Sequence, residues 1–153
     1  MAGFSTAMPN SFKPELATAV HNFTITTGNV FKCALGKVSP TGIYGTTTTN
    51  YSDLTGNSDE VSGTGYSAGG FAWTAAQNLT PLNTTTQTYW QWSVNPSWST
   101  ATFSTVGCII YNSSASNKAV YVGSFGGTQT VVAGTFTLVQ PTNGAGTSLL
   151  QLN

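Results

Sequence analysis

The chain has 153 residues, of which 39% are hydrophobic and only 5% are charged, and its formal net charge at pH 7 is zero. A chain of this length forms one domain with a sizeable core, and its composition is not that of a disordered protein. It has no arginine and four scattered lysines, too few to neutralise nucleic-acid phosphates or to bind an anionic membrane surface. We therefore expect neither nucleic acid nor a membrane among its partners.

The N-terminal third combines an arm, a helix and two strands. Residues 1–10 are small and polar, and we expect an extended arm. A short helix is predicted over 11–20, since a serine can cap its start and Pro14 falls in the first turn, where proline is tolerated. Alternation of apolar and polar residues then predicts strands at 21–25 and 30–35.

Residues 39–70 are rich in threonine and glycine and predict a long loop, with at most a short edge strand at 46–49. Three of the four acids lie in it: Asp53, Asp59 and Glu60. We interpret them as side chains of a solvated loop. A calcium site and acid–base catalysis are the alternatives, but the spacing matches no EF-hand loop.

The rest of the chain predicts six more strands, at 71–76, 88–94, 103–111, 118–125, 130–139 and 149–152. The two central ones form a hairpin around a polar turn at 112–117. In 103–111, alternation places Val106, Cys108 and Ile110 on one face. It places Phe103, Thr105, Ile109 and Tyr111 on the other. Neither face is strongly polar, so this strand should be covered on both sides. In 130–139, Val132, Phe136 and Leu138 should share one face.

This spacing of short strands predicts an all-β fold, a β-sandwich or jelly-roll-like antiparallel domain over 11–153 with a short N-terminal helix. Cys33 and Cys108 both lie in apolar strand-like runs and are expected to be buried free thiols, with a disulfide as the alternative. His21, the single histidine, is expected to be a structural or surface residue, because it has no partner residues at metal-site spacing.

Four tryptophans are the most interesting side chains for binding: Trp73, Trp90, Trp92 and Trp98. Core packing is the favoured interpretation, and an interface or a sugar-stacking platform is the alternative. No nucleophile elbow or phosphate-binding loop is present, and one histidine with four acids leaves few groups for catalysis. We therefore expect a protein that is not an enzyme and that needs no cofactor or metal.

Three stretches resemble a family of small virion structural proteins of tailed bacteriophages. They are NSFKPEL…HNF…VFKCAL from Asn10 to Leu35, EVSGTGYSAGG from Glu60 to Gly70, and WSTATF…IYN from Trp98 to Asn112. They occur in order over most of residues 10–125. The resemblance implies a component of the phage particle and names no active site.

The leading hypothesis is a capsid decoration, or cement, protein on the outer surface of the phage head. It would be made in the host cytoplasm and would bridge neighbouring copies of the major capsid protein, as a trimer or another small homo-oligomer. The arm and the 39–70 loop are the expected contact regions, because both lack a core-forming pattern. The candidate interface residues are Phe4, Met8, Phe12, Tyr44, Tyr51, Tyr66 and Trp98. The alternative is a tail- or fibre-associated module that binds host-surface glycan through tryptophan and tyrosine.

Overall fold

The computed structural model describes residues 2–152, so Met1 of the predicted arm and Asn153 of the predicted domain lie outside the described range. Strands make up 42% of the chain and helices 9%, which confirms the all-β prediction. None of the helices between residues 2 and 152 is both long and apolar enough to cross a membrane.

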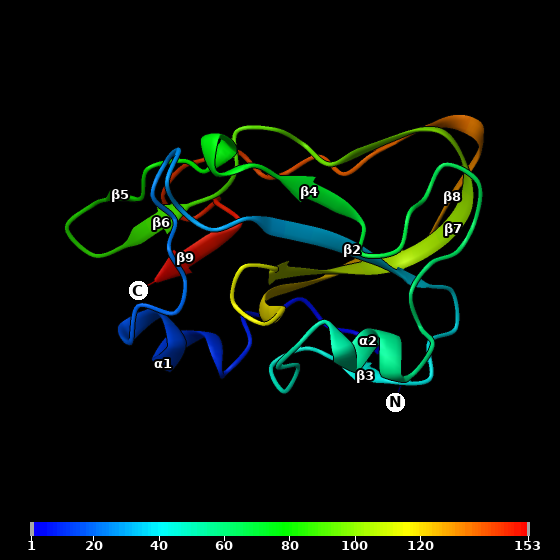
Figure 1. The fold of residues 1–153 in the computed structure, drawn as a ribbon, viewed down its shortest axis with the longest axis horizontal. Helices are drawn as coiled ribbons and strands as arrows, with labels where there is room; N and C mark the ends of the chain where they lie inside the picture. Colours follow the sequence, from blue (N-terminus) through cyan, green and yellow to red (C-terminus); the bar gives the residue numbers. More distant parts are fainter. Residues whose placement is uncertain (1, 153) are drawn as a thin grey trace.

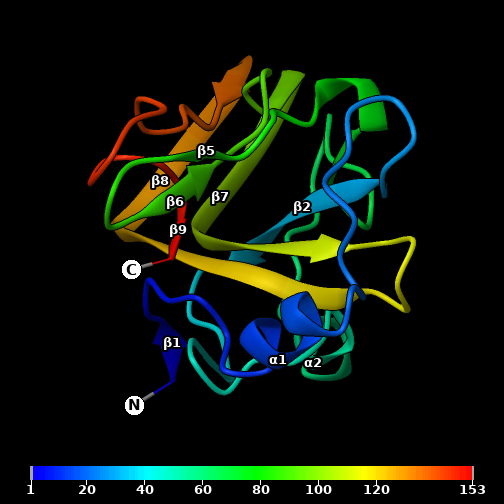
Figure 2. The same cartoon turned by 90° about the vertical axis from the view of Figure 1, so that its left-hand side faces the viewer.

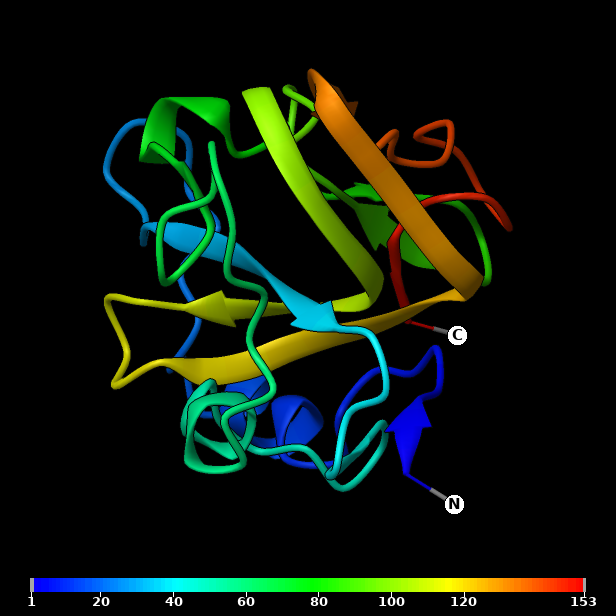
Figure 3. The same ribbon diagram turned by 90° about the vertical axis from the view of Figure 1, so that its right-hand side faces the viewer.

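The centre of the fold is a four-stranded antiparallel sheet in the order β4-β2-β7-β8 (Figure 1). Its strands are β2 (Phe31–Lys37), β4 (Phe71–Trp73), β7 (Ser97–Asn112) and β8 (Lys118–Thr137). The predicted hairpin is therefore present and longer than expected, because β8 continues through the two glycines at 126–127. Figure 3 shows β7 and β8 side by side along most of their length.

Smaller elements flank this main sheet. An antiparallel sheet is formed by β5 (Leu82–Asn83), β6 (Thr88–Trp90) and β9 (Leu150–Leu152), and a parallel pair by β1 (Gly3–Phe4) and β3 (Ile43–Tyr44). The helices are α1 (Phe12–Ala17), α2 (Ser52–Gly56) and the 3₁₀ helix η1 (Ala75–Gln77). In Figure 2, α1, α2 and β1 lie on one side of the β7–β8 hairpin, away from β5 and β6.

The main sheet is buried on both faces around β2 and the inner halves of β7 and β8 (107–124), as predicted for its central strand. One face carries the larger core, which includes Cys33 and Leu35 of β2 and all four tryptophans. The other face carries a second core, in which Ala34 and Ile109 pack against side chains of β3 and α2. Strand alternation explains this division, since neighbouring residues of β2 point to opposite faces.

Two irregularities in the hairpin place side chains on a different face of the sheet from the one that simple alternation predicted. The pairing of β7 with β8 shifts between Thr105 and Gly107, and Phe103 therefore joins the larger core with Cys108 and Ile110 instead of lying on the opposite face. In β8, Ala133 has a φ of 48°. Val132 beside it is 73% exposed, whereas Phe136 and Leu138 pack on the larger core, so the prediction that these three side chains share one face was wrong.

Other sequence predictions were wrong for local reasons. The predicted helix ends at Ala17, before the left-handed Ala19, and Ser11 makes no side-chain cap bond. Residues 21–25 form no strand, because the Asn22 side chain accepts a hydrogen bond from the Thr24 amide and favours a turn. The 46–49 segment is a turn and not an edge strand.

Candidate functional site

Three of the predicted interface residues lie in the cores and cannot offer their side chains to a partner in this conformation. Phe12 is fully buried, Tyr44 is 1% exposed and Trp98 is 6% exposed. Phe12 packs in the larger core against His21 and Phe23. Phe12 is buried because it lies on the apolar face of the six-residue helix α1. Tyr44 is buried because β3, in which it lies, pairs with β1.

Phe4 anchors the N-terminal arm to its own sheet. Gly36 and Gly107 are paired across β2 and β7, and a Cβ built on either would lie about 2.1–2.5 Å from atoms of the Phe4 ring. The ring occupies the space that these missing side chains leave, and it stacks on Tyr44 at a centroid distance of 4.6 Å. Half-buried Met8 packs on the larger core. The arm is therefore part of the fold, and glycines inside two strands were the sequence signal for it.

Tyr51 and Tyr66 are half-buried and are held by one carboxylate, that of Glu60. Their hydroxyls donate to Glu60 at 2.6 and 2.8 Å, and the Gly69 amide donates to it at 2.7 Å. The Tyr66 hydroxyl also accepts a hydrogen bond from the Leu35 amide. Burial and the nearby Glu60 charge raise the pKa of both tyrosines, which stay neutral. This cluster holds the 60–69 segment against β2.

Asp59 organises the other half of the 39–70 segment. Its carboxylate is fully buried and accepts hydrogen bonds from Tyr44 Oη at 2.6 Å, the Gly42 amide at 2.8 Å and the Thr41 amide at 2.9 Å. Lys37 Nζ lies 3.1 Å from it. Burial by itself raises the pKa of Asp59, but these donors together hold it well below its ordinary value. Asp59 is therefore an ionised, structural carboxylate.

Asp53 accepts hydrogen bonds from the Thr49 and Asn50 amides at 2.8 and 3.2 Å, and it closes the turn before α2. All three acids of this segment thus bind groups of the protein. The interpretation as a solvated loop was wrong, because the tyrosines and amides that bind the carboxylates lie at positions that spacing alone does not reveal.

Of the two roles predicted for His21, structural or surface, the structure shows the structural one. Its ring is buried, with Nε2 3.0 Å from Glu15 Oε2 and Nδ1 3.1 Å from Asn112 Nδ2. The asparagine amide donates to Nδ1, so Nε2 carries the proton and donates to the carboxylate. Burial is the main cause that lowers the pKa of His21, which agrees with a neutral ring. Glu15 also pairs with Lys118 at 2.6 Å and ties α1 to β8.

All four tryptophans are buried, with exposed fractions between 1% and 6%. Trp73 and Trp92 stack on each other at a centroid distance of 4.4 Å, and Trp98 packs on Phe103 and Phe136. This confirms the prediction that they belong to the core. The glycan-binding hypothesis consequently has no exposed tryptophan on which to rest.

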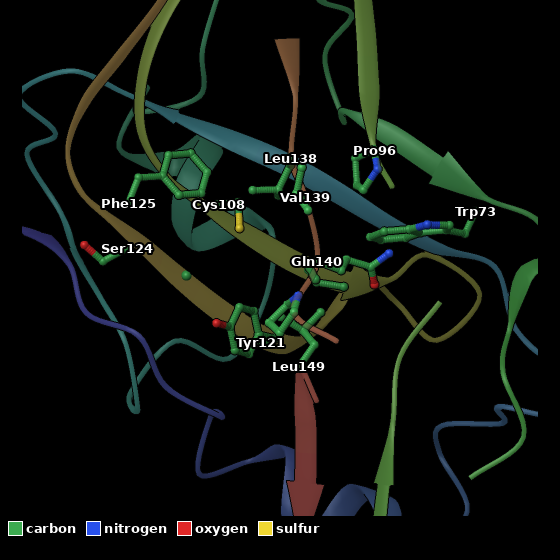
Figure 4. A pocket seen from close by; sticks show the side chains of 13 residues that line it. Trp73, Pro96, Cys108, Tyr121, Ser124, Phe125, Leu138, Val139, Gln140 and Leu149 are labelled. Atoms are coloured by element: carbon green, nitrogen blue, oxygen red, sulfur yellow. The ribbon is translucent and has the colours of Figure 1, made fainter. Parts of the chain in front are cut away.

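A pocket of about 180 Å³ lies between the β7–β8 hairpin and the segment that follows β8 (Figure 4). Its walls are mainly apolar and include Trp73, Phe125 and Leu138. The Gln140 amide is occupied, because it donates to the Val94 carbonyl at 2.9 Å. Of the thirteen described lining residues none is a carboxylate or a histidine, so the pocket could bind an apolar group but offers no acid–base pair.

Cys33 and Cys108 are both buried free thiols, as predicted. The hydrogen bond between the two side chains and their burial raise the pKa of Cys33 far above its ordinary value, so this thiol is not ionised at neutral pH. Within residues 2–152, no cluster of three or more histidine, cysteine, aspartate or glutamate side chains could hold a metal ion.

Comparison with models of protein families, with curated proteins and with solved structures finds no match. All four carboxylates and the histidine are engaged in hydrogen bonds inside the fold, and what remains on the surface is mainly hydroxyl, amide and apolar groups.

Proposed function

We propose that this chain is a structural protein of a tailed-phage particle, a decoration protein that binds the outside of the head and bridges neighbouring major capsid subunits. The observation that carries the proposal is that the ionisable groups that could serve catalysis are bound within the fold. A protein with such a surface acts through shape, hydrogen bonds and apolar contacts. Those are the interactions of a stable assembly.

The resemblance to virion proteins gains weight from where its three stretches lie. The first stretch includes Phe31–Leu35 of β2 and the third corresponds to β7, and all five of these β2 residues pair with residues of the third stretch. The second stretch, 60–70, contributes Tyr66, whose hydroxyl binds the backbone of β2 and whose ring packs on Trp98. The resembling residues thus form one structural framework, which supports a shared fold more strongly than three separate short motifs would.

The mechanism would be stabilisation by binding. A decoration protein that contacts only the assembled shell shifts the equilibrium toward that shell, by about 2.7 kcal/mol per site when its free concentration is 100 times the dissociation constant. A surface with few charges permits many copies to pack closely without mutual repulsion.

The test uses particles of the phage that encodes the chain, with and without a deletion of its gene. We expect the protein in purified heads, its density repeated over the shell in an electron cryomicroscopy reconstruction, and a lower thermal stability of deletion heads that the added protein restores. Absence from purified heads, together with unchanged stability of deletion heads, would refute the proposal.

Two exposed apolar side chains allow the contact face to be located. Ile43 of β3 is 65% exposed, and Leu82 of β5 is 47% exposed. They belong to the two small sheets on different sides of the main sheet. Binding of Ile43→Lys and Leu82→Lys variants to deletion heads can be compared directly. We expect one of the two substitutions to weaken binding at least tenfold and the other to leave it unchanged.

A further inference from the structure

The outer half of β8 is an open edge of the main sheet. β8 is the last strand in the sheet order, so only one of its sides faces β7. Its inner half is covered: Ala7 of the arm bridges Val122, and Asn50 bridges Lys118. Within residues 2–152, no backbone group pairs with the outer side of 126–135, and most of these residues are exposed. This half of β8 is the upper, orange part of the strand in Figure 3.

The open edge has a defined length. Gln129, Thr130 and Val131 pair in regular register with β7. The register with β7 shifts on both sides of these three residues, although β8 is continuous through them. Gly126, with a φ of 72°, and Ala133, with a φ of 48°, bound a short extended segment that has the three regularly paired residues at its centre. About six residues, 127–132, can therefore accept a further strand, which is a common strand length.

Open edges in natural proteins usually carry lysine, proline or another device that prevents strand addition. This edge carries no lysine and no proline: residues 119–152 contain no charged side chain, and the first proline after β8 begins is Pro141. Irregular pairing occurs only on either side of Gln129–Val131 and leaves these three residues in regular register. The edge segment is instead GTQTVV, in which threonine and valine favour extended structure. The side chain of Val132 is 73% exposed, the highest value among the exposed large hydrophobic side chains.

An apolar hollow adjoins the same edge. It has a volume of about 260 Å³ and is lined by Phe125, Gln129, Phe136, Thr137 and Leu138. Gln129 shares its face of the strand with Val131, which packs on the larger core, whereas Thr130 and Val132 point to the opposite face. An added strand would consequently extend the sheet and cover the hollow with its inward side chains.

We propose that the occupant of this edge is the same edge of a second copy of the chain, paired antiparallel across a twofold axis near Thr130. Two identical strands in antiparallel pairing present the same donors and acceptors to each other, so the edge is complementary to itself. Two copies also meet without charge repulsion, since neither carries an ionic group on this segment. The result is a dimer with one continuous eight-stranded sheet, built from two four-stranded sheets.

This inference does not depend on the role in a phage particle, and it gives a dimer where the decoration-protein hypothesis favoured a trimer among small homo-oligomers. A strand pair of this length buries less than the roughly 800 Å² per partner of a standard interface, so association should require high protein concentration. Copies that are held side by side on a surface would meet that condition.

The first test is sedimentation velocity from low micromolar to near-millimolar protein, with hydrogen-exchange mass spectrometry at both ends of the range. We expect concentration-dependent dimers and slower exchange of the 127–132 amides in the dimer. A monomer at every concentration would overturn the proposal. So would a dimer in which the exchange of these amides is unchanged.

The second test uses a matched pair of valines. Val132 and Val139 are 73% and 72% exposed, but only Val132 lies on the open edge. We expect Val132→Lys to weaken dimerisation at least tenfold, because a lysine on an open edge opposes the addition of a strand, and Val139→Lys to leave it unchanged. Equal effects of the two substitutions would contradict the proposal, and tryptophan fluorescence verifies that both variants are folded.

The third test locates the axis by cross-linking. Single cysteines at 128, 130 and 132 place thiols on the exposed face, while the native Cys33 and Cys108 are buried. Under oxidation by oxygen with copper phenanthroline, we expect at least one of these variants to form disulfide-linked dimers and Val139→Cys to remain monomeric. Failure of all three to cross-link, or equal cross-linking at 139, would overturn the proposed pairing.

Discussion

Replacement of Asp59 by alanine is the sharpest test of the proposed organisation of residues 39–70. The change removes the acceptor for two backbone amides and for the Tyr44 hydroxyl, which is itself 1% exposed. Removing one partner of a buried, hydrogen-bonded ion pair costs about 3–5 kcal/mol, because the remaining polar groups lose their partners. Lys37, the cationic partner, has a side chain that is 36% exposed and can be hydrated, so we expect about 4 kcal/mol.

The loss should appear in urea unfolding at pH 7, followed by tryptophan fluorescence, because all four tryptophans are buried in the folded state. For a domain of this size it corresponds to a decrease in melting temperature of roughly 10 °C. Asp53→Ala is the matched control: it removes the same charge from the same segment, but Asp53 caps two turn amides and should cost about 1 kcal/mol.

The pH dependence gives a second, independent measure. The folded pKa of Asp59 lies below its unfolded value, so its contribution to stability is fully present above about pH 4 and is lost as the pH falls through the folded pKa. The difference in unfolding free energy between the wild-type protein and Asp59→Ala should therefore shrink below about pH 4. A difference under about 1 kcal/mol at pH 7, or one that does not decrease in acid, would refute the reasoning.

Three further predictions concern the backbone, the thiols and the phenols. Gly70→Ala should lower the free energy of unfolding in urea by more than about 4 kcal/mol, because its Cβ would lie 1.9 Å from the Cys33 carbonyl oxygen. The control is Gly126→Ala, which has nearly the same φ but open space around it and should cost about 1–2 kcal/mol. Cys33 and Cys108 should not react with a thiol reagent until the protein unfolds, and a fast reaction of the native protein would contradict their burial. Burial raises the pKa of Tyr121 to about 12, so its contribution to stability should be lost as the pH rises above about 10. In an absorbance titration, the phenol should ionise at a higher pH in the folded protein than in the protein unfolded by urea.

The strands were predictable where alternation continues without interruption. In β2, Phe31, Cys33 and Leu35 point into the larger core as the sequence pattern predicts. The covered hairpin was predictable for the same reason, since apolar residues occupy both faces of β7. Alternation failed at Phe103 and Val132, because an irregular residue in the ladder reverses which face the following side chains occupy.

The 39–70 segment was not predictable, because its structure depends on contacts between residues far apart in the sequence. Tyr44 and Asp59 are fifteen residues apart, and the Tyr66 hydroxyl meets the backbone of Leu35 across thirty-one. A segment rich in threonine and glycine has the same composition whether it is a mobile loop or a folded layer. Only the buried carboxylates that accept hydrogen bonds distinguish a folded layer from a mobile loop, and no local sequence pattern reveals them.

The scarcity of charge links these observations. Each carboxylate is bound by amides, hydroxyls or a cation of the same chain, so the ionic groups here hold α1 and the 39–70 segment in place. Apart from exposed lysines such as Lys13, the surface offers neutral features for association. Of these, the open edge of β8 is the one that the chain leaves uncovered after covering the other half of the same strand. An uncharged open edge promotes aggregation of an isolated protein, and it promotes assembly of a protein that meets its own copies in a fixed arrangement. Val132 lies on this edge, and the single substitution Val132→Lys should prevent the edge from pairing with a second copy.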